Sequence, residues 1–400
     1  MNLLTKKFLR NKFLEYYRKK NLKLKIPNNL KNREWGFILF DELPNIVMRR
    51  HKSYGSKREI EDYIRGIVPA HAFYSAAYYK HPSAPTMNEK HWLGADLIFD
   101  LDADHISGSD LKSYSEMLRI VKKETLKLID FLIKDFGFSE DVINIVFSGS
   151  RGYHIHVQDP RVFKLKSSER REIVDYISGI GLDYDSVLKK KKMAVRNKYL
   201  TIIDKKSVDM PTFSKRVANG IIEFFCAIRF EMEKKDAIKK LREIKGVDNV
   251  SKAEKILKSL YNFKNQEELR DRIFKEGLDQ STAMFSVRRF IAEQVSLKSI
   301  RGKTDEPVTI DIKRLIRMPT SLHGGSSMVV TPLSMDSIDD FDPLTDAVVF
   351  KDTETKIKVL KPYNVFEMKD NTFKVEKGIN YLPEYAAMYL MCRGVAEYEY

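Results

Sequence analysis

The chain has 400 residues, of which 43% are hydrophobic and 32% charged, and its 71 Lys and Arg against 56 Asp and Glu give a net charge of +15. This length allows two or three domains or subdomains with real cores. No run of about 18 apolar residues occurs, which excludes a membrane-spanning helix. Two cysteines are too few for a disulfide framework or a four-cysteine metal site. We expect a cytoplasmic, intracellular protein whose natural partners are polyanions.

Much of the positive charge lies in the first 60 residues, which contain 16 Lys and Arg but only 5 Asp and Glu. A second basic run, Lys189–Lys192, lies in the middle of the chain. Such runs are typical either of solvated faces or of surfaces that track phosphates, and charge alone does not separate the two. The first segment also has apolar residues at the spacing of one helix face, so we expect an amphipathic helix that packs on the chain's own core. The residues of that face are Leu9, Phe13, Tyr16 and Tyr17.

Strand and helix patterns alternate in the next part of the chain. Residues 95–102, ADLIFDLD, predict a strand. Residues 143–157, INIVFSGSRGYHIHV, predict a hairpin, because a Gly-rich turn separates two apolar runs. Between these segments, residues 111–137 predict a long helix that ends near Gly137.

The middle of the chain is mostly helical before strand patterns return. The helical patterns run from about residue 167 to 299. In residues 307–331, strand-like VTIDI and SMVVT flank DIKRLIRM, for which we expect a helical turn. Further strand patterns (VVF, KIKVL and TFKVE) and a helix near 383–392 follow. This order predicts an α/β core interrupted by a helical insertion.

Asp100 and Asp102 are the most informative residues of the first strand. Side chains two apart share one strand face, so the two carboxylates project together from backbone positions roughly 7 Å apart. Each carboxylate would resist ionisation beside the other, and a divalent cation such as Mg²⁺ or Mn²⁺ removes that conflict. The alternative is a strand end that reaches solvent with both Asp side chains hydrated.

The turn SGSRG contains small residues and one cation. Ser148, the glycines and Arg151 suit a loop whose backbone N–H groups approach a phosphate, and His154 follows on the next strand. The alternative is a hairpin turn whose glycines serve only backbone geometry.

A third element follows the helical region. Arg314 and Arg317 are three residues apart and share a face if they lie on a helical turn, and His323 follows in a Gly-flanked loop. They suit a second phosphate-binding group, or else an ordinary surface Arg pair. Nucleotidyl transfer requires carboxylates that hold two metal ions and cations that bind a triphosphate.

These motifs, in this order, resemble the catalytic small subunit of archaeal and eukaryotic DNA primase. The matching segments are LIFDLDAD, SGSRGYHIHV and DEPVTIDIKRLIRMPTSLHGG, and IVMRRHKSY is similar to an early basic strand of the family. The resemblance implies an α/β (α+β) archaeo-eukaryotic primase (prim) core. That core would comprise residues 1–165 and 300–400, with a mostly helical inserted subdomain at 166–299.

The resemblance also implies site residues. Asp100 and Asp102 match the metal-binding acidic pair, and the family's spacing selects Asp305 rather than Asp311 as the third acid. The implied nucleotide-binding residues are Arg50, Ser148, Arg151, His154, Arg317 and His323.

The activity implied is template-directed synthesis of short RNA primers on single-stranded DNA, with two Mg²⁺ or Mn²⁺ ions as cofactors. The implied partners are a large primase subunit, the DNA template, the RNA primer and nucleoside triphosphates. No contact with a membrane is implied. We expect no structural zinc, because the region that carries a zinc knuckle in many members has no cysteine here, and His105 alone cannot form one. Two alternatives stay open. One is a related prim-fold polymerase acting in end repair or gap filling, and the other is a non-catalytic nucleic-acid-binding subunit.

Overall fold

The computed structural model shows a chain of mixed helices and sheets. It describes residues 1–103, 113–181, 190–195, 198–203, 213–269 and 308–399, with the single positions 287, 290, 291 and 294. Two compact units divide the chain. Unit 1 comprises 1–129, 138–174 and 298–400, and unit 2 comprises 130–137 and 175–297. Within the described ranges, no helix is long and apolar enough to cross a membrane.

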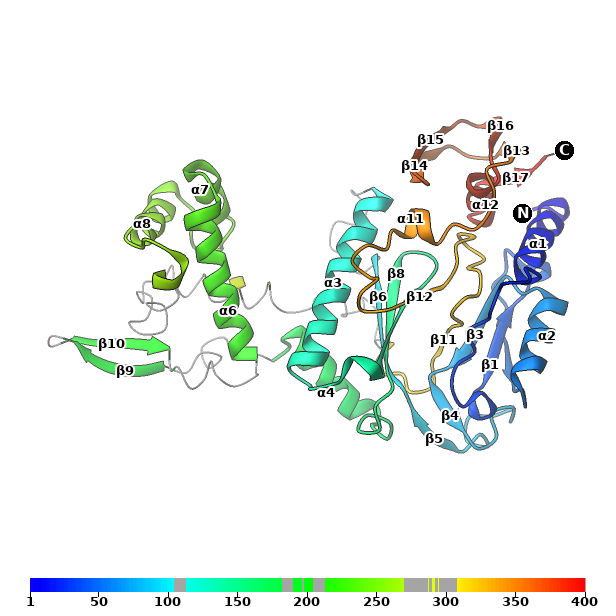
Figure 1. The fold of residues 1–400 in the computed structure, drawn as a ribbon, viewed down its shortest axis with the longest axis horizontal. Coiled ribbons are helices and arrows are strands. Elements are labelled where there is room, and N and C mark those ends of the chain that lie inside the picture. Colours follow the sequence, from blue (N-terminus) through cyan, green and yellow to red (C-terminus); the bar gives the residue numbers. More distant parts are fainter. Residues whose placement is uncertain are drawn as a thin grey trace. The chain divides into compact units, whose positions relative to one another are not determined.

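Unit 1 begins with two helices and a four-stranded sheet. The helices are α1 (Leu3–Tyr17) and α2 (Lys57–Ile67). The sheet has the order β11-β3-β1-β2, with β1 Trp35–Ile38, β2 Arg49–Lys52, β3 His71–Ser75 and β11 Leu315–Arg317. Leu9 and Phe13 of α1 and Ile60 of α2 are fully buried in one core with Trp35 and Phe37 of β1. The expectation that the first helix packs on its own core is therefore confirmed (Figure 1).

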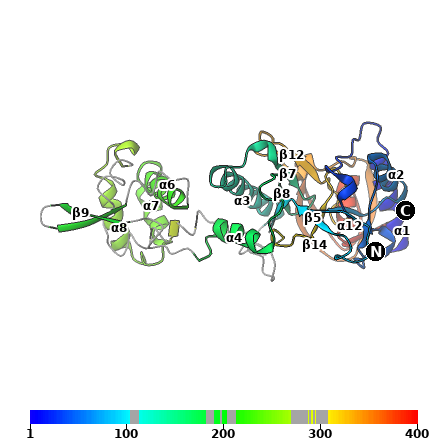
Figure 2. The ribbon, with the colours of Figure 1, turned by 90° about the horizontal axis from the view of Figure 1, so that it is seen from below.

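The second sheet of unit 1 has the order β12-β7-β8-β6. Its strands are β6 (Leu97–Asp102), β7 (Ile143–Phe147), β8 (Gly152–Val157) and β12 (Thr331–Leu333). Helix α3 (Tyr114–Lys134) lies along this sheet in both ribbon views (Figure 1, Figure 2). The predicted strand, helix and hairpin are confirmed, because β7 and β8 pair antiparallel and Gly137 has a positive φ of 64° just beyond α3.

The C-terminal part of unit 1 is a set of short strands around one buried helix. The strands are β13 (Glu354–Val359), β14 (Tyr363–Met368), β15 (Asn371–Val375), β16 (Gly378–Pro383) and β17 (Ala396–Tyr398). All nine residues of helix α12 (Glu384–Cys392) are buried. A short helix, α11 (Pro343–Asp346), precedes these elements, and a two-stranded sheet pairs β4 (Ala77–Tyr79) with β5 (Trp92–Ala95).

Helices dominate the described residues between 167 and 260. They are α4 (Ser167–Ser178), α6 (Phe213–Cys226), α7 (Lys234–Arg242) and α8 (Val250–Leu260). A π-helical segment, η6 (Ala227–Glu231), separates α6 from α7. The sequence patterns missed an antiparallel hairpin of β9 (Lys190–Val195) and β10 (Lys198–Ile203).

Residues 307–331 differ from the sequence expectation. The helical turn predicted for DIKRLIRM is wrong, because Leu315–Arg317 form β11 and pair with β3. Residues 308–310 form turns rather than the expected VTIDI strand. The local pattern misled because Ile316 is buried by a partner strand that lies about 240 residues earlier in the chain, which periodicity alone does not reveal.

Candidate active site

The two carboxylates of β6 lie on the same face of the second sheet. Leu97, Phe99 and Leu101 are fully buried on the other face, as strand alternation requires. Antiparallel pairing with β8 sets Asp100 opposite His154 and Asp102 opposite Gly152. The side chains of Asp100 and Asp102 are 27% and 31% exposed, so both carboxylates remain accessible from solvent.

Two nitrogen-containing side chains from the β7–β8 hairpin lie beside these carboxylates. His154 Nε2 is 3.5 Å from Asp100 Oδ1, and Arg151 Nε is 3.8 Å from Asp102 Oδ1. Burial lowers the pKa of His154 to about 3, and the charges of Arg317 and Arg314 add to this effect. His154 is therefore a neutral imidazole at pH 7 and can donate one N–H. Within the described residues, its buried Nδ1 has no hydrogen-bond partner.

The loop between β7 and β8 is closed by its own backbone and by Ser148. Ser148 N donates to Gly152 O at 2.9 Å, and Gly152 N donates to Ser148 Oγ at 3.3 Å. Gly149 has a φ of +82°, and a Cβ there would lie 2.8 Å from His323 Cβ. At Gly152, a Cβ would lie 1.9 Å from the backbone oxygen of Leu101. Only glycine fits these two positions without displacing the neighbouring loop or strand.

Arg317 reaches the same region from β11. Its guanidinium is 5.0 Å from the centre of the Phe73 ring, and its Nη1 is 2.6 Å from His71 Nδ1. Burial lowers the pKa of Arg317 to about 10, while the negative charges of Asp100 and Asp102 oppose that fall. Arg317 is therefore still a cation at neutral pH, and its charge acts on both carboxylates.

His71 is a site residue that sequence reasoning missed. It sits at the start of β3 with no motif around it, and only the pairing of β3 with β11 brings it to Arg317. Burial and the nearby Arg317 charge lower the pKa of His71 well below its usual value, so it is neutral. Its Nδ1 accepts a hydrogen bond from Gly324 N at 3.3 Å, and its ring lies edge-on to His323 with 4.9 Å between ring centres.

His323 is buried at the contact between two loops. Gly325 N donates to its Nδ1 at 3.1 Å, and the Ser326 hydroxyl donates to the backbone oxygen of Gly149. Burial lowers the pKa of His323 well below its usual value, with further contributions from the charges of Arg317 and Arg393. This contact brings residues 323–326 against the 148–152 loop.

The structure thus brings most of the expected site residues into one region of unit 1. They are Asp100, Asp102, Ser148, Arg151, His154, Arg317 and His323. Arg50 is engaged elsewhere, on β2, where its Nε and Nη2 contact the two carboxylate oxygens of Glu34 at 3.0 and 3.2 Å. Burial opposes ionisation of Glu34, but Arg50 overcomes it and lowers the pKa of that carboxyl. Asp305 lies outside the described residues, as do His105 and residues 104–112.

The donors present suit a hard divalent cation. Two carboxylates on one strand face supply oxygen ligands of the kind that Mg²⁺ and Mn²⁺ prefer. Among the residues that the structure describes, no group of three or more His, Cys, Asp and Glu is placed to hold a metal ion. A third carboxylate would have to come from outside those residues, and Asp311 instead accepts a hydrogen bond from Lys313 N at 2.9 Å.

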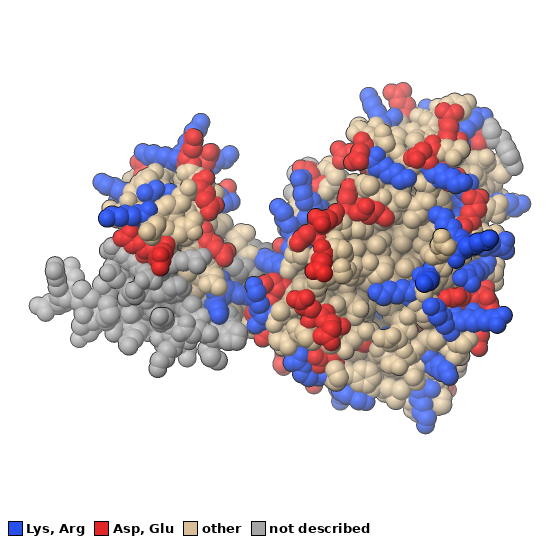
Figure 3. Space-filling model, viewed as in Figure 1, with Lys and Arg blue, Asp and Glu red and all other residues tan. Residues whose placement is uncertain are grey.

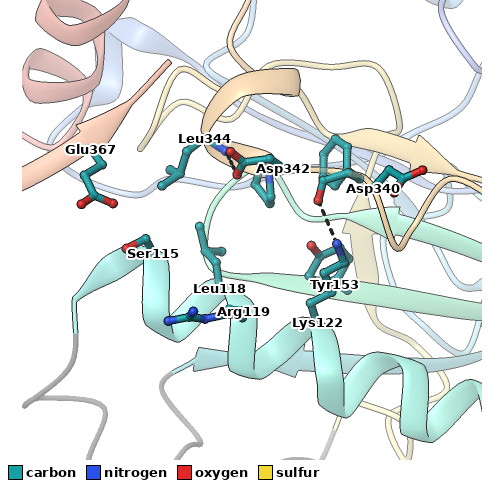
Figure 4. A pocket seen from close by; sticks show the side chains of 11 residues that line it. Ser115, Leu118, Arg119, Lys122, Tyr153, Asp340, Asp342, Leu344 and Glu367 are labelled. Atoms are coloured by element: carbon teal, nitrogen blue, oxygen red, sulfur yellow. Dashed lines mark hydrogen bonds between the residues drawn. The ribbon is translucent and has the colours of Figure 1, made fainter. Parts of the chain in front are cut away.

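A separate pocket of about 420 Å³ lies on the opposite face of β8 (Figure 4). Tyr153, which alternates with His154 along the strand, lines it together with α3 and residues 340–344. Lys122 Nζ donates to the backbone oxygen of Phe341 at 3.2 Å across this pocket. Three carboxylates, of Asp340, Asp342 and Glu367, outnumber the two cations that line it, Arg119 and Lys122. On the face of Asp100 and Asp102, the cations of Arg151 and Arg317 match the two carboxylates in number, so that face suits a metal-bound triphosphate better.

Comparison with known proteins identifies similar chains over the full length. The family model for the DNA primase small subunit matches residues 99–335. The DNA primase small subunit PriS of Methanococcoides burtonii is 49% identical, with all of both chains covered. The protein of the same name from Methanosarcina barkeri is 45% identical over 98% of this chain and 97% of its own. That of Methanocella arvoryzae is 45% identical over all of both chains.

Proposed function

Because this chain belongs to the DNA primase small subunit family, we propose that it is the catalytic subunit of a DNA primase and synthesises short RNA primers on single-stranded DNA during replication. The observation that carries this proposal is the convergence of Asp100 and Asp102 with Arg317, a cation from a strand more than 200 residues away. An acidic pair beside fixed cations suits transfer of a nucleotide from a triphosphate.

In this proposal, Asp100, Asp102 and Asp305 hold two Mg²⁺ or Mn²⁺ ions. Such ions, when bound, lower the pKa of an attacking hydroxyl and neutralise charge on the triphosphate. Ser148 and Arg151 present the phosphate loop, and Arg317 supplies a cation that His71 holds in place. His154 and His323, both neutral, donate N–H groups to phosphate oxygens. Arg50 is proposed to approach the incoming nucleotide after release from Glu34.

For the domain organisation, we propose a prim core of residues 1–165 and 300–400 and a mostly helical inserted subdomain at 166–299. The division into two compact units supports this proposal, since most of unit 2 is the continuous segment 175–297. The helices α6, α7 and α8 within that segment also support it.

The DNA template is proposed to contact the N-terminal basic region. A cleft of about 240 Å³ there is lined by Lys7, Arg10, Arg18 and Arg65, with no carboxylate in its lining. Lys and Arg side chains also gather on the side of unit 1 where α1 and α2 lie (Figure 3). Clustered cations of this kind suit a phosphodiester backbone. A large primase subunit, the RNA primer and nucleoside triphosphates are the other proposed partners, within the cell and beside chromosomal DNA.

The test is synthesis from ribonucleotides on unprimed single-stranded DNA, with Mg²⁺ or Mn²⁺ and with or without a large subunit. Asp100→Asn should abolish synthesis, because the variant removes a charged metal ligand. Asp141→Asn, at an exposed position before β7, is the matched control and should leave synthesis unchanged.

Two other outcomes would favour the alternatives. Synthesis only from a supplied primer would favour a prim-fold polymerase acting in end repair or gap filling. Full synthesis by Asp100→Asn would favour a non-catalytic nucleic-acid-binding subunit and refute the metal assignment.

A further inference from the structure

Two side chains outside the expected site act on the 148–152 loop. Tyr114, the first residue of α3, donates its hydroxyl hydrogen to the backbone oxygen of Ser150 at 2.5 Å. Arg393 follows the last residue of α12, and its guanidinium lies 5.1 Å from the centre of the Tyr114 ring. Neither residue belongs to a motif that the sequence reasoning used.

The Tyr114 hydrogen bond fixes the orientation of a peptide group in the loop. A trans peptide is planar, with its C=O and N–H pointing in opposite directions. Holding the Ser150 oxygen therefore also directs the N–H of Arg151 away from Tyr114. The Ser326 hydroxyl holds the preceding peptide in the same manner through the oxygen of Gly149. Two successive N–H groups are thus oriented by side chains from outside the loop, which is the kind of backbone arrangement that binds phosphate.

Arg393 is a cation enclosed by aromatic rings. Its guanidinium is 4.5 Å from the centre of the Tyr389 ring, and the rings of Tyr389 and Tyr114 are 6.2 Å apart. Its Nε and one Nη are buried and have no hydrogen-bond acceptor among the described residues. The Tyr389 hydroxyl does interact with the guanidinium, and the ring faces attract it through cation–π interactions.

In the part of the chain that the structure describes, no carboxylate forms a salt bridge with Arg393, whose neighbours are the side chains of Tyr114 and Tyr389. The charge of Arg393 nevertheless acts on the candidate site, because it helps to lower the pKa of His323. Cys392, the preceding residue, lies against the backbone of Ser327, in the same loop as His323. A cation withdrawn from water without a counter-ion is costly, and a bound anion nearby would lower that cost.

We propose that Tyr114 and Arg393 are positioning residues for the triphosphate of the incoming nucleotide. Tyr114 sets the orientation of the 148–152 loop. Arg393 holds the Tyr114 ring in place and adds a positive charge for which the described residues supply no carboxylate partner. The inference rests on the proposed function in one respect, since it takes the anion to be a nucleoside triphosphate.

The decisive variant is Tyr114→Phe in the full-length chain. It removes the hydroxyl but keeps the ring that Arg393 packs against. The measurements are KM and kcat for ribonucleotide incorporation and, separately, equilibrium binding of a non-hydrolysable ATP analogue. We expect the KM for the nucleotide and the Kd for the analogue each to rise about tenfold, with kcat changed by less than about twofold. This is the effect of losing one hydrogen bond that orients a binding group.

Tyr385→Phe is the matched control. Tyr385 is buried on the same helix as Tyr389, and its hydroxyl accepts a hydrogen bond from Asn371 Nδ2 at 3.1 Å, away from the loop. This variant should lose a similar amount of stability without a change in nucleotide KM. Arg393→Gln should weaken nucleotide binding and reduce its salt dependence, and Arg393→Lys should restore the salt dependence.

The outcomes separate this inference from the proposed function. If the wild-type chain binds the analogue and Tyr114→Phe and Arg393→Gln bind it equally well, the inference is wrong and the proposed function is untouched. A lower melting temperature with unchanged nucleotide KM would also overturn it, since that marks a purely structural role. A wild-type chain that binds no nucleoside triphosphate would overturn both proposals.

Discussion

Gly149→Ala should be far more damaging than an ordinary glycine substitution. Gly149 has a φ of +82°, and placing an alanine in this left-handed region costs about 1 kcal/mol. The added Cβ would also lie 2.8 Å from His323 Cβ and 3.2 Å from Val330 Cγ2. His323 cannot yield easily, because its backbone N donates to Met328 O at 2.9 Å and its oxygen accepts from Ser327 N at 2.8 Å. Overpacking of this kind adds about 1–3 kcal/mol.

The expected total loss is therefore about 2–4 kcal/mol in the free energy of unfolding of unit 1. Gly394→Ala separates the two contributions. Gly394 has a similar φ of +68° in the same unit, but nothing lies within 4 Å of the position of its Cβ. That control should lose only about 1 kcal/mol. Urea denaturation measures both losses.

The substitution should also reduce primer synthesis. Displacement of His323 by a few tenths of an ångström, or of the phosphate loop, should lower kcat/KM on the order of tenfold to a hundredfold. Equal destabilisation by Gly149→Ala and Gly394→Ala would refute the reasoning, because the contact with His323 would then cost nothing. The reasoning would also be refuted if the Gly149→Ala chain were destabilised but kept full activity per folded molecule.

Three further predictions concern charge and titration. Arg317→Met should lower kcat/KM for nucleotide incorporation by about 10²–10³, whereas Arg314→Met, at an exposed position, should have a several-fold effect at most; equal losses would contradict the assignment. His156 is buried with its pKa lowered by burial to about 3, so the folded state stays neutral while the unfolded chain takes up a proton below about pH 6.5. Its contribution to stability is therefore complete above that pH and is lost as the pH falls, by about 1 kcal/mol between pH 7 and 5.5. His156→Gln should flatten the dependence of unfolding free energy on pH, and an unchanged slope would show that another group is responsible. In unit 2, Arg216→Met should destabilise by about 2 kcal/mol, because the carboxylates of Asp130 and Asp135 lose a cation that is only 14% exposed. Lys134→Met, which removes a 71% exposed cation, should cost less than about 1 kcal/mol. Thermal melts compare the two variants.

Local patterns predicted the elements whose burial depends on near neighbours. The β7–β8 hairpin follows from two apolar runs and a turn, and α3 follows from its helical period and Gly137. The strand β11 was misread as helix because its burial comes from pairing with the distant β3. The hairpin of β9 and β10 was missed because KKKMAV is too rich in lysine to read as a strand.

The candidate site shows the same division. Asp100 and Asp102 could be predicted to share a face, because strand alternation is a property of the local backbone. That Arg317 lies near them, and that His71 holds Arg317, depends on how two sheets meet. No sequence pattern near His71 carries that information. The ion pair of Arg50 with Glu34 is likewise not predictable, since Glu34 comes just before β1 and only the pairing of β1 with β2 brings it to Arg50.

The buried position of α12 has a consequence for synthesis of the protein on the ribosome. This helix packs in the core that also contains α1 and β1, and the backbone N of Asn2 donates to Glu397 at 2.7 Å. Residues of α1 and residues 384–392, far apart in the sequence, thus pack in one hydrophobic core. Unit 1 can reach its final fold only after residues 384–392 have been synthesised and have left the exit tunnel. Until then, the earlier core residues remain exposed, which makes the nascent chain a substrate for chaperones.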